Sequence, residues 1–143
     1  MERHAIPVIK AVMTPFPYSI ELDSPLVEAR RMMADHGIRH LPVTQGRRLV
    51  GVVSERDVQR ALDSGPAPGA SARVRDAYRS DVYAVQLGER LDAVLLRMAA
   101  RGLGSAVVLK GDRIAGIFTT TDACRCFAEF LRDQLPGGGD EAA

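Results

Sequence analysis

The chain has 143 residues, of which 46% are hydrophobic and 26% are charged, and its formal net charge is +1. This composition is typical of a soluble globular protein that forms one compact domain or two small intertwined ones. The near-neutral charge gives no electrostatic basis for binding nucleic acid or an anionic membrane, and no apolar run approaches the roughly 18–20 residues that span a bilayer. No secretory signal is apparent at the N-terminus, so we expect a cytoplasmic protein.

The first half of the chain predicts a strand, a helix, two strands and a second helix. An extended segment at residues 18–20 leads into a helix whose start, at residues 23–25, carries a capping residue followed by a proline. Gly37 suits the left-handed conformation in which many helices end. The apolar face of this helix comprises Leu26, Ala29, Met32 and Met33. The remaining expected elements are strands at residues 41–44 and 49–53, joined by a hairpin turn, and a helix at residues 55–62.

The second half predicts the same order of elements. An extended segment at residues 82–85 precedes a helix that residues 88–90 open and Gly102 ends. The elements expected after it are strands at residues 106–109 and 114–118 and a long helix at residues 120–135.

Composition divides the chain into two repeats. Residues 64–73 are rich in glycine, proline and alanine and predict a linker, and the glycine-rich residues 134–143 predict a disordered tail. The repeats themselves then occupy residues 8–63 and 74–133. Because a unit of about 60 residues is only marginally stable alone, we expect the two repeats to pack on each other.

The same sequence pattern occurs twice at a constant spacing. Residues 37–43 correspond to residues 102–108, and Ser54-x-x-Asp57 corresponds to Thr119-x-x-Asp122. The offset is 102 − 37 = 65 at the first pair and 122 − 57 = 65 at the second. Such a repeat predicts two equivalent structural units around a pseudo-two-fold axis, with a functional site between them.

Residues 8–130 resemble the tandem CBS-domain module, also called a Bateman module. The resemblance rests on Val-Met-Thr-Pro at residues 12–15, on residues 37–43, and on Gly-Val-Val-Ser-Glu-Arg-Asp at residues 51–57, with their duplicates. It implies an α+β fold of two βαββα repeats packed about a pseudo-two-fold axis. It also implies a stand-alone regulatory module that binds AMP, ADP, ATP or S-adenosylmethionine between the repeats. Such modules usually form flat homodimers and act on an effector protein, which here is unknown and separate.

Each Ser/Thr-x-x-Asp motif follows an apolar strand and opens a helix. Free backbone N–H groups and the helix dipole favour phosphate at such a position. A carboxylate one turn later can accept hydrogen bonds from both ribose hydroxyls, and the resemblance assigns this role to Asp57 and Asp122. The alternative is a capping box, in which the hydroxyl and the carboxylate bond the helix's own first N–H groups. The sequence leaves both interpretations open.

The two repeats differ in charge near these motifs. The first carries Arg39, His40 and Arg56, which in resembling modules would reach the ligand phosphates, whereas the second has Gly104, Ser105 and Thr121 at the same places. The hypothesis is that the first site prefers a phosphorylated ligand, while the second takes a less charged ligand or stays empty. The alternatives are a solvated strand end or an interface salt bridge for Arg39 and His40, and an exposed helix position for Arg56.

An adenine ring would need an apolar slot. The candidates, each of which is also an ordinary core residue, are Ile38, Val53, Ala84, Leu103 and Phe118. The complete set of predicted ligand-binding residues is Ile38, Arg39, His40, Pro42, Ser54, Arg56, Asp57, Ala84, Thr119, Thr121 and Asp122.

Other function classes are less well supported. The chain shows no nucleophile–base pairing, metal-ligand spacing or phosphate loop, so we expect no catalytic residue, no metal and no required cofactor. The alternative to a ligand sensor is a ligand-independent homodimeric interaction module with empty or blocked sites, favoured by Arg56 where resembling modules have a small hydroxyl residue. Apolar residues beyond the needs of one core face support a dimer; they are Met32, Met33, Leu95, Leu96 and Met98. Cys124 and Cys126 are expected to be buried or half-buried thiols.

Overall fold

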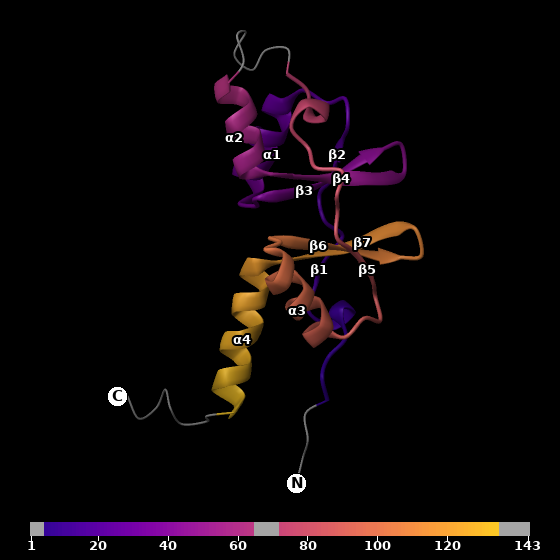
Figure 1. Cartoon of the computed structure of the whole chain (residues 1–143), viewed down its shortest axis with the longest axis vertical. Helices are drawn as coiled ribbons and strands as arrows, with labels where there is room; N and C mark the ends of the chain where they lie inside the picture. Colours follow the sequence, from indigo (N-terminus) through magenta and orange to yellow (C-terminus); the bar gives the residue numbers. More distant parts are fainter. Residues whose placement is uncertain (1–4, 65–71, 135–143) are drawn as a thin grey trace, which may run out of the picture.

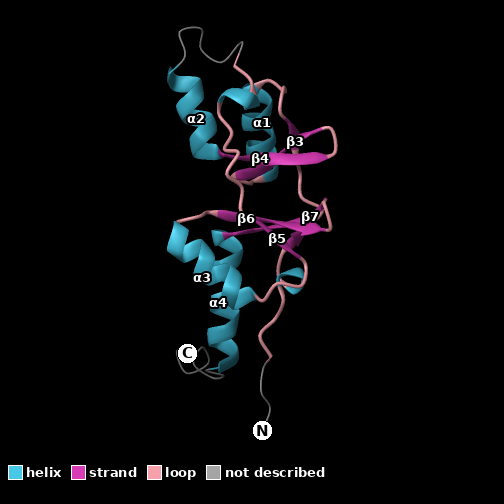
Figure 2. Cartoon of the chain, turned by 45° about the vertical axis from the view of Figure 1, so that its right-hand side comes forward, coloured by secondary structure: helices cyan, strands magenta, loops and turns pink. Residues whose placement is uncertain are grey.

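The computed structural model describes residues 5–64 and 72–134, which form four layers. Two sheets face each other across the middle of the molecule, and a pair of helices covers the outer face of each sheet (Figures 1 and 2). The first repeat contains β2 (Ile20–Glu21), α1 (Leu26–His36), β3 (His40–Gln45), β4 (Arg48–Ser54) and α2 (Glu55–Ser64). The second contains β5 (Ala84–Gln86), α3 (Leu91–Arg101), β6 (Ser105–Lys110), β7 (Arg113–Thr119) and α4 (Thr120–Gln134). The predicted α+β fold of two βαββα repeats is confirmed.

Each repeat has its own hydrophobic core between its sheet and its helices. Leu26, Leu41 and Val43 are fully buried in the first core, and Val94 and Phe118 are fully buried in the second. Because side chains alternate along a strand, Leu41 and Val43 face the helices while His40 and Pro42 face the other sheet. The surface between the two sheets is therefore where the residues of both repeats meet.

The chain also exchanges segments between the repeats, which the sequence patterns did not predict. The strand β1 (Thr14–Pro15) pairs antiparallel with β7 of the second repeat, and Arg79 forms an antiparallel bridge with Val52 of β4 in the first. Ile9, in a short 3-10 helix at Ile9–Ala11, is fully buried in the second core. Val74, in the equivalent 3-10 helix at Val74–Asp76, is fully buried in the first core. Each repeat is therefore completed by the segment that precedes the other repeat.

This exchange explains why the expectation of a capping side chain at residues 23–25 is wrong, although both helices begin directly after the residues expected to open them. Pro25 is itself the N-cap residue of α1, and among the described residues no side chain caps that helix. Instead, the Leu26 N–H donates to the Ala72 carbonyl at 2.9 Å, and the Leu91 N–H that begins α3 donates to the Pro7 carbonyl at 2.9 Å. The crossing segments, residues 5–15 on the second repeat and residues 72–79 on the first, thus supply the acceptors that capping side chains would otherwise provide.

The predicted helix ends are confirmed, because Gly37 and Gly102 both adopt a left-handed conformation at φ +63°. Two other expectations are wrong. Cys124 is exposed rather than buried, whereas Cys126 is half-buried as expected. Met33 and Met98 are buried core residues and not surplus apolar surface.

The exposed apolar surface of the second repeat lies mostly on α4. Its members, with their exposed fractions, are Leu96 at 70%, Phe127 at 62%, Phe130 at 52% and Leu131 at 40%. Within the described ranges, no helix combines the length and the hydropathy needed to cross a membrane. Most of the predicted linker, at residues 65–71, and the tail from residue 135 onward lie outside the described residues.

Candidate ligand-binding site

Asp57 and Asp122 occupy equivalent positions one turn into α2 and α4. In the first repeat, His40 and Ser54 are paired across β3 and β4, and the Glu55 N–H donates to the Arg39 carbonyl at 2.8 Å. This pairing brings the start of α2 next to the start of β3. The second repeat repeats the arrangement, with Ser105 opposite Thr119 and the Thr120 N–H donating to the Gly104 carbonyl at 3.1 Å. Residues that are 14 or more positions apart in each repeat thus converge on one edge of the sheet.

Both Ser/Thr-x-x-Asp motifs form capping boxes. Ser54 donates from its backbone N–H and its hydroxyl to Asp57 Oδ2, at 3.2 and 2.8 Å, and accepts from the Asp57 N–H at 3.1 Å. Thr119 makes the same three bonds with Asp122, at 2.9, 3.2 and 3.3 Å. The cap uses only Oδ2 of each carboxylate. Capping and ligand binding are therefore not mutually exclusive, because Oδ1 of each carboxylate has no role in the cap.

The Oδ1 atoms meet different partners in the two repeats. Arg79 Nε lies 3.3 Å from Asp57 Oδ1, and Arg60 Nη1 lies 4.0 Å from the same oxygen. Asp122 Oδ1 accepts from Arg125 Nη1 at 3.1 Å and from the Thr14 hydroxyl at 3.4 Å. These four partners are related by the repeat offset, since 125 − 60 = 65 and 79 − 14 = 65.

Both carboxylates are buried, with 6% of Asp57 and 4% of Asp122 exposed. Neither Thr14 nor Arg79 was predicted to be at these sites. Thr14 and Arg79 are 65 positions apart, the same offset as the repeats. Only the segment exchange brings Thr14 to Asp122 and Arg79 to Asp57.

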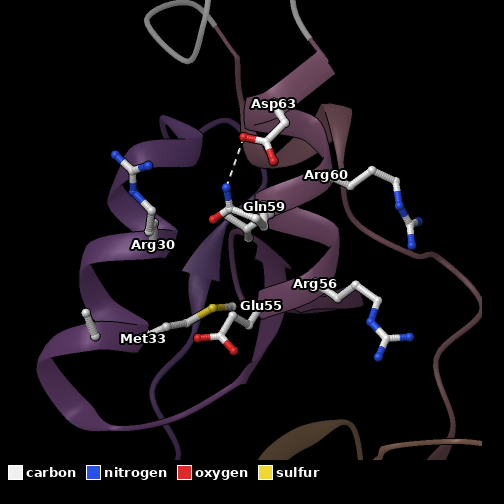
Figure 3. Close-up of a pocket in the computed structure, with 9 residues that line it drawn as sticks. Arg30, Met33, Glu55, Arg56, Gln59, Arg60 and Asp63 are labelled. Atoms are coloured by element: carbon white, nitrogen blue, oxygen red, sulfur yellow. Dashed lines mark hydrogen bonds between the residues drawn. The ribbon is translucent and has the colours of Figure 1, made fainter.

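Arg39 and Arg56, the predicted phosphate contacts, are exposed around the Asp57 site. Arg39 Nε lies 3.9 Å from Glu55 Oε1, and both side chains are more than half exposed, so this ion pair is weak. Figure 3 shows Arg56 and Arg60 extending from the same side of α2, away from α1. This side of α2 therefore carries two guanidinium groups near Asp57.

His40 lies between the two repeats. Its Nε2 is 2.9 Å from where a Cβ on Gly104 would lie. Burial lowers the pKa of the His40 imidazole; the Asp57 carboxylate opposes this shift. A mostly buried, neutral imidazole would act as a hydrogen-bond donor or acceptor rather than as a fixed positive charge.

The candidates for an apolar slot divide into two groups. Val53 and Phe118 are fully buried in the two cores, so the core interpretation holds and neither can line a ligand site. Ile38 and Leu103 are half-buried at the edges of the cores, and Ala84 is exposed. The other predicted residues are Pro42, which is buried on the face of β3 that looks toward the other sheet, and Thr121, which is exposed on α4.

In the part of the chain that the structure describes, two cavities border the helices. One, of about 580 Å³, lies between α1 and α2; its lining includes Arg30, Met33 and Gln59 (Figure 3). The other, of about 780 Å³, is bounded by α3, α4 and residues 5–7, and its lining includes Phe127 and Phe130. Both lie on the helical layers, but Arg56 and Arg60 also line the first, so that cavity borders the predicted Asp57 site.

The chain is similar to parts of longer proteins. An L-aspartate semialdehyde sulfurtransferase of Methanocaldococcus jannaschii is 25% identical over 124 residues, which are 85% of this chain and 23% of that protein. An inosine-5'-monophosphate dehydrogenase of Korarchaeum cryptofilum is 47% identical over 51 residues, 36% of this chain and 10% of that protein. This chain thus spans less than a quarter of either relative. The catalytic activities in their names are those of the longer proteins.

Solved structures of similar size share the whole fold. The protein AcuB from Vibrio cholerae superposes with a TM-score of 0.81 at 24% identity, covering 91% of this chain and 96% of that one. The CBS domain pair of protein MJ0100, in complex with 5'-methylthioadenosine and S-adenosyl-L-methionine, superposes with a TM-score of 0.78 at 23% identity, covering 87% and 98%.

The family model of the CBS domain matches twice, at residues 2–64 and 74–129. These matches cover most of both βαββα repeats, ending within α4 of the second. The chain therefore belongs to the CBS domain family and carries two CBS domains in tandem.

Proposed function

We propose that the chain is a non-catalytic regulatory module that binds an adenosine derivative between its two CBS domains and acts on a separate partner protein. The observation that carries the proposal is the pair of buried carboxylates, Asp57 and Asp122, at the starts of α2 and α4. Each carboxylate is held in place by its capping box through Oδ2, so its Oδ1 has a fixed position. A carboxylate fixed in this way can accept hydrogen bonds from ribose hydroxyls with little loss of side-chain entropy.

The ligand class follows from the helix starts and the polar side chains near the carboxylates. Ser54 and Thr119 lie next to the helix starts, where the dipole favours phosphate oxygens, while their hydroxyl protons are donated to Asp57 and Asp122. Arg39, His40 and Arg56 would approach a phosphate at the Asp57 site, and Thr121 would offer a neutral hydroxyl at the Asp122 site. Ile38, Pro42 and Ala84 complete the set of proposed contacts. AMP, ADP, ATP and S-adenosylmethionine are the ligands proposed, and the adenosine derivatives held by the CBS pair of MJ0100 support this class.

We also propose that the chain acts as a homodimer. The exposed apolar side chains of α3 and α4, Leu96 and Phe127 above all, provide surface that a second copy would bury. A ligand that favours one arrangement of the dimer over another would then alter the surface offered to the effector protein.

A second candidate function is a ligand-independent interaction module. It is favoured by the ion pair between Arg79 and Asp57, which occupies the carboxylate oxygen that a ribose would need. Under this hypothesis the apolar surface of α4 is still an interface, but neither carboxylate binds a small molecule.

The test is thermal unfolding of the purified chain with AMP, ADP, ATP, S-adenosylmethionine, NAD or adenosine, alongside the variants Asp57→Asn and Asp122→Asn. A ligand present at 100 times its dissociation constant adds about 2.7 kcal/mol to the free energy of unfolding, which raises Tm by several degrees. We expect a shift with at least one ligand, reduced in one of the variants. A Tm unchanged by every ligand would contradict binding of these ligands and favour the interaction module. Phosphate or AMP released from ATP over hours would contradict the non-catalytic part of the proposal.

A further inference from the structure

Position 79 is one of the places where the surroundings of the two buried carboxylates differ in charge. Thr14 and Arg79 are equivalent, because each lies on the crossing segment that completes the other repeat's sheet. Arg79 is fixed by its main chain, since its N–H donates to the Val52 carbonyl at 2.8 Å and its carbonyl accepts from the Val52 N–H at 3.0 Å. A Cβ on Gly51 of β4 would collide with the Arg79 carbonyl, so glycine at position 51 permits this close approach. The backbone position of Arg79 is therefore fixed by hydrogen bonds, as it would be for a residue within the sheet.

The guanidinium of Arg79 binds Asp57 with only one of its nitrogen atoms. Its Nε lies 3.3 Å from Asp57 Oδ1 and 3.4 Å from Oδ2. Among the residues that the structure describes, these are the only hydrogen bonds of the Arg79 side chain, which is 63% exposed. Because the guanidinium is a planar, rigid fork, binding through Nε orients the two terminal NH₂ groups and leaves them for another acceptor.

The charges around the two sites reinforce this difference. Around Asp57, the cations are Arg39, Arg56, Arg60 and Arg79 and the anions are Glu55 and Asp57, so the sum is 4 − 2 = +2. The residues 65 positions away are Gly104, Thr121, Arg125, Thr14, Thr120 and Asp122, and their sum is 1 − 1 = 0. A positive site flanked by exposed guanidinium groups attracts an anion, whereas the neutral site has no such preference.

We propose that Arg79 is the specificity-determining residue of the Asp57 site. Asp57 orients the guanidinium through Nε, and the terminal NH₂ groups bind the phosphate of a nucleoside phosphate whose ribose contacts the same carboxylate. The Asp57 site then selects phosphorylated over unphosphorylated nucleosides, and the Asp122 site, with Thr14 in the equivalent place, does not. This inference rests on the proposed binding of an adenosine derivative.

The experiment is isothermal titration of the full chain with AMP and with adenosine. It is performed in an Asp122→Asn background, which leaves Thr119 a side-chain acceptor for its cap and weakens the second site. The variant is Arg79→Gln, which keeps a polar side chain and removes the charge. The matched control is Arg47→Gln, which removes the same charge from the β3–β4 turn, at the opposite end of β4 from Ser54. Tm without ligand is measured for each variant to establish that the fold is intact.

We expect AMP to bind at least tenfold more tightly than adenosine to the Asp122→Asn protein, because charge-assisted bonds to phosphate are strong. Arg79→Gln should reduce the ratio of the two affinities at least fivefold by lowering the affinity for AMP alone. Arg47→Gln should leave the ratio unchanged. In the reciprocal protein, Thr14→Arg combined with Asp57→Asn, the Asp122 site should gain a preference for AMP.

Three results would overturn the inference, and one of them also concerns the proposed function. If Arg79→Gln increases the affinities for AMP and for adenosine equally, Arg79 blocks the site and does not select the ligand. If the AMP-to-adenosine ratio is unchanged by Arg79→Gln, Arg79 has no part in selection, although binding itself stands. If neither AMP nor adenosine binds the Asp122→Asn protein or the unmodified chain, both the inference and nucleotide binding are wrong.

Discussion

The imidazole of His40 in the first repeat lies against the backbone of Gly104 in the second. Its Nε2 atom is 2.9 Å from the position that a Cβ on residue 104 would take, closer than non-bonded atoms approach. Gly104 is equivalent to Arg39, since 104 − 39 = 65, so the two repeats have different side chains where they meet. The glycine thus allows His40 to occupy the space between the sheets.

Replacing Gly104 by alanine should destabilise the protein by about 1–3 kcal/mol, because the added methyl group displaces a mostly buried imidazole. The free energy of unfolding is measured by urea denaturation. In a double-mutant cycle with His40→Ala, the alanine at 104 should cost less, with a coupling energy of about 0.5–3 kcal/mol. Gly88→Ala is the control, since a Cβ there meets nothing within 4 Å. Equal costs of Gly104→Ala with and without His40 would contradict the contact.

The stability of the protein should fall as the pH is lowered through the range in which free histidine gains its proton. Burial lowers the pKa of His40 below that of the unfolded chain, with Arg39 adding to the shift and Asp57 and Glu55 opposing it. The unfolded state therefore takes up more protons as the pH falls below about 6.5, and the free energy of unfolding decreases. The contribution is complete above that pH and declines below it.

The measurement is urea denaturation of the natural protein and of His40→Gln at several pH values between 5 and 8. The variant should lose less stability than the natural protein over this range, because a glutamine does not titrate. Parallel curves for the two proteins would show that His40 has the same affinity for protons in the folded and unfolded states.

Removing either buried carboxylate should cost stability without any ligand. Asp57→Ala and Asp122→Ala should each lower the free energy of unfolding by about 1–3 kcal/mol, because two donors of the preceding hydroxyl residue lose their acceptor. Asp57→Asn and Asp122→Asn retain an acceptor and should cost less. The control is Asp63→Ala, an exposed residue that accepts one bond from Gln59 at 3.0 Å. A cost for Asp57→Ala no larger than that of Asp63→Ala would mean that the capping box contributes nothing.

The proposed homodimer makes a separate prediction about the apolar surface of α4. Phe127→Glu should shift the protein from dimer to monomer at micromolar concentration, because a carboxylate would be buried without a partner at the interface. Sedimentation equilibrium measures the mass in solution. The matched control is Phe16→Glu, which makes the same change at a side chain 91% exposed outside α3 and α4. A monomer before any substitution would refute the dimer.

The local features of the fold could be predicted from the sequence because their causes are local. Glycines at positions 37 and 102 end helices because only a residue without a side chain adopts φ +63° at little cost. Alternating and helical apolar patterns gave the strands and helices of both repeats, and the offset of 65 residues gave their equivalence. The capping interpretation of Ser54-x-x-Asp57 was also available, because its bonds span three residues.

What the sequence by itself determined was therefore the family, the repeat and the two carboxylates. Only the tertiary structure decided what surrounds them. Thr14 reaches Asp122 across 108 positions, and Arg79 reaches Asp57, because each crossing segment pairs with the sheet of the other repeat. A local sequence pattern cannot predict such a pairing, because the pairing depends on backbone hydrogen bonds between segments that are remote in sequence. The sequence thus contains the charged residues that distinguish the two sites. The exchange of segments decides where Arg79 and Thr14 lie relative to the carboxylates.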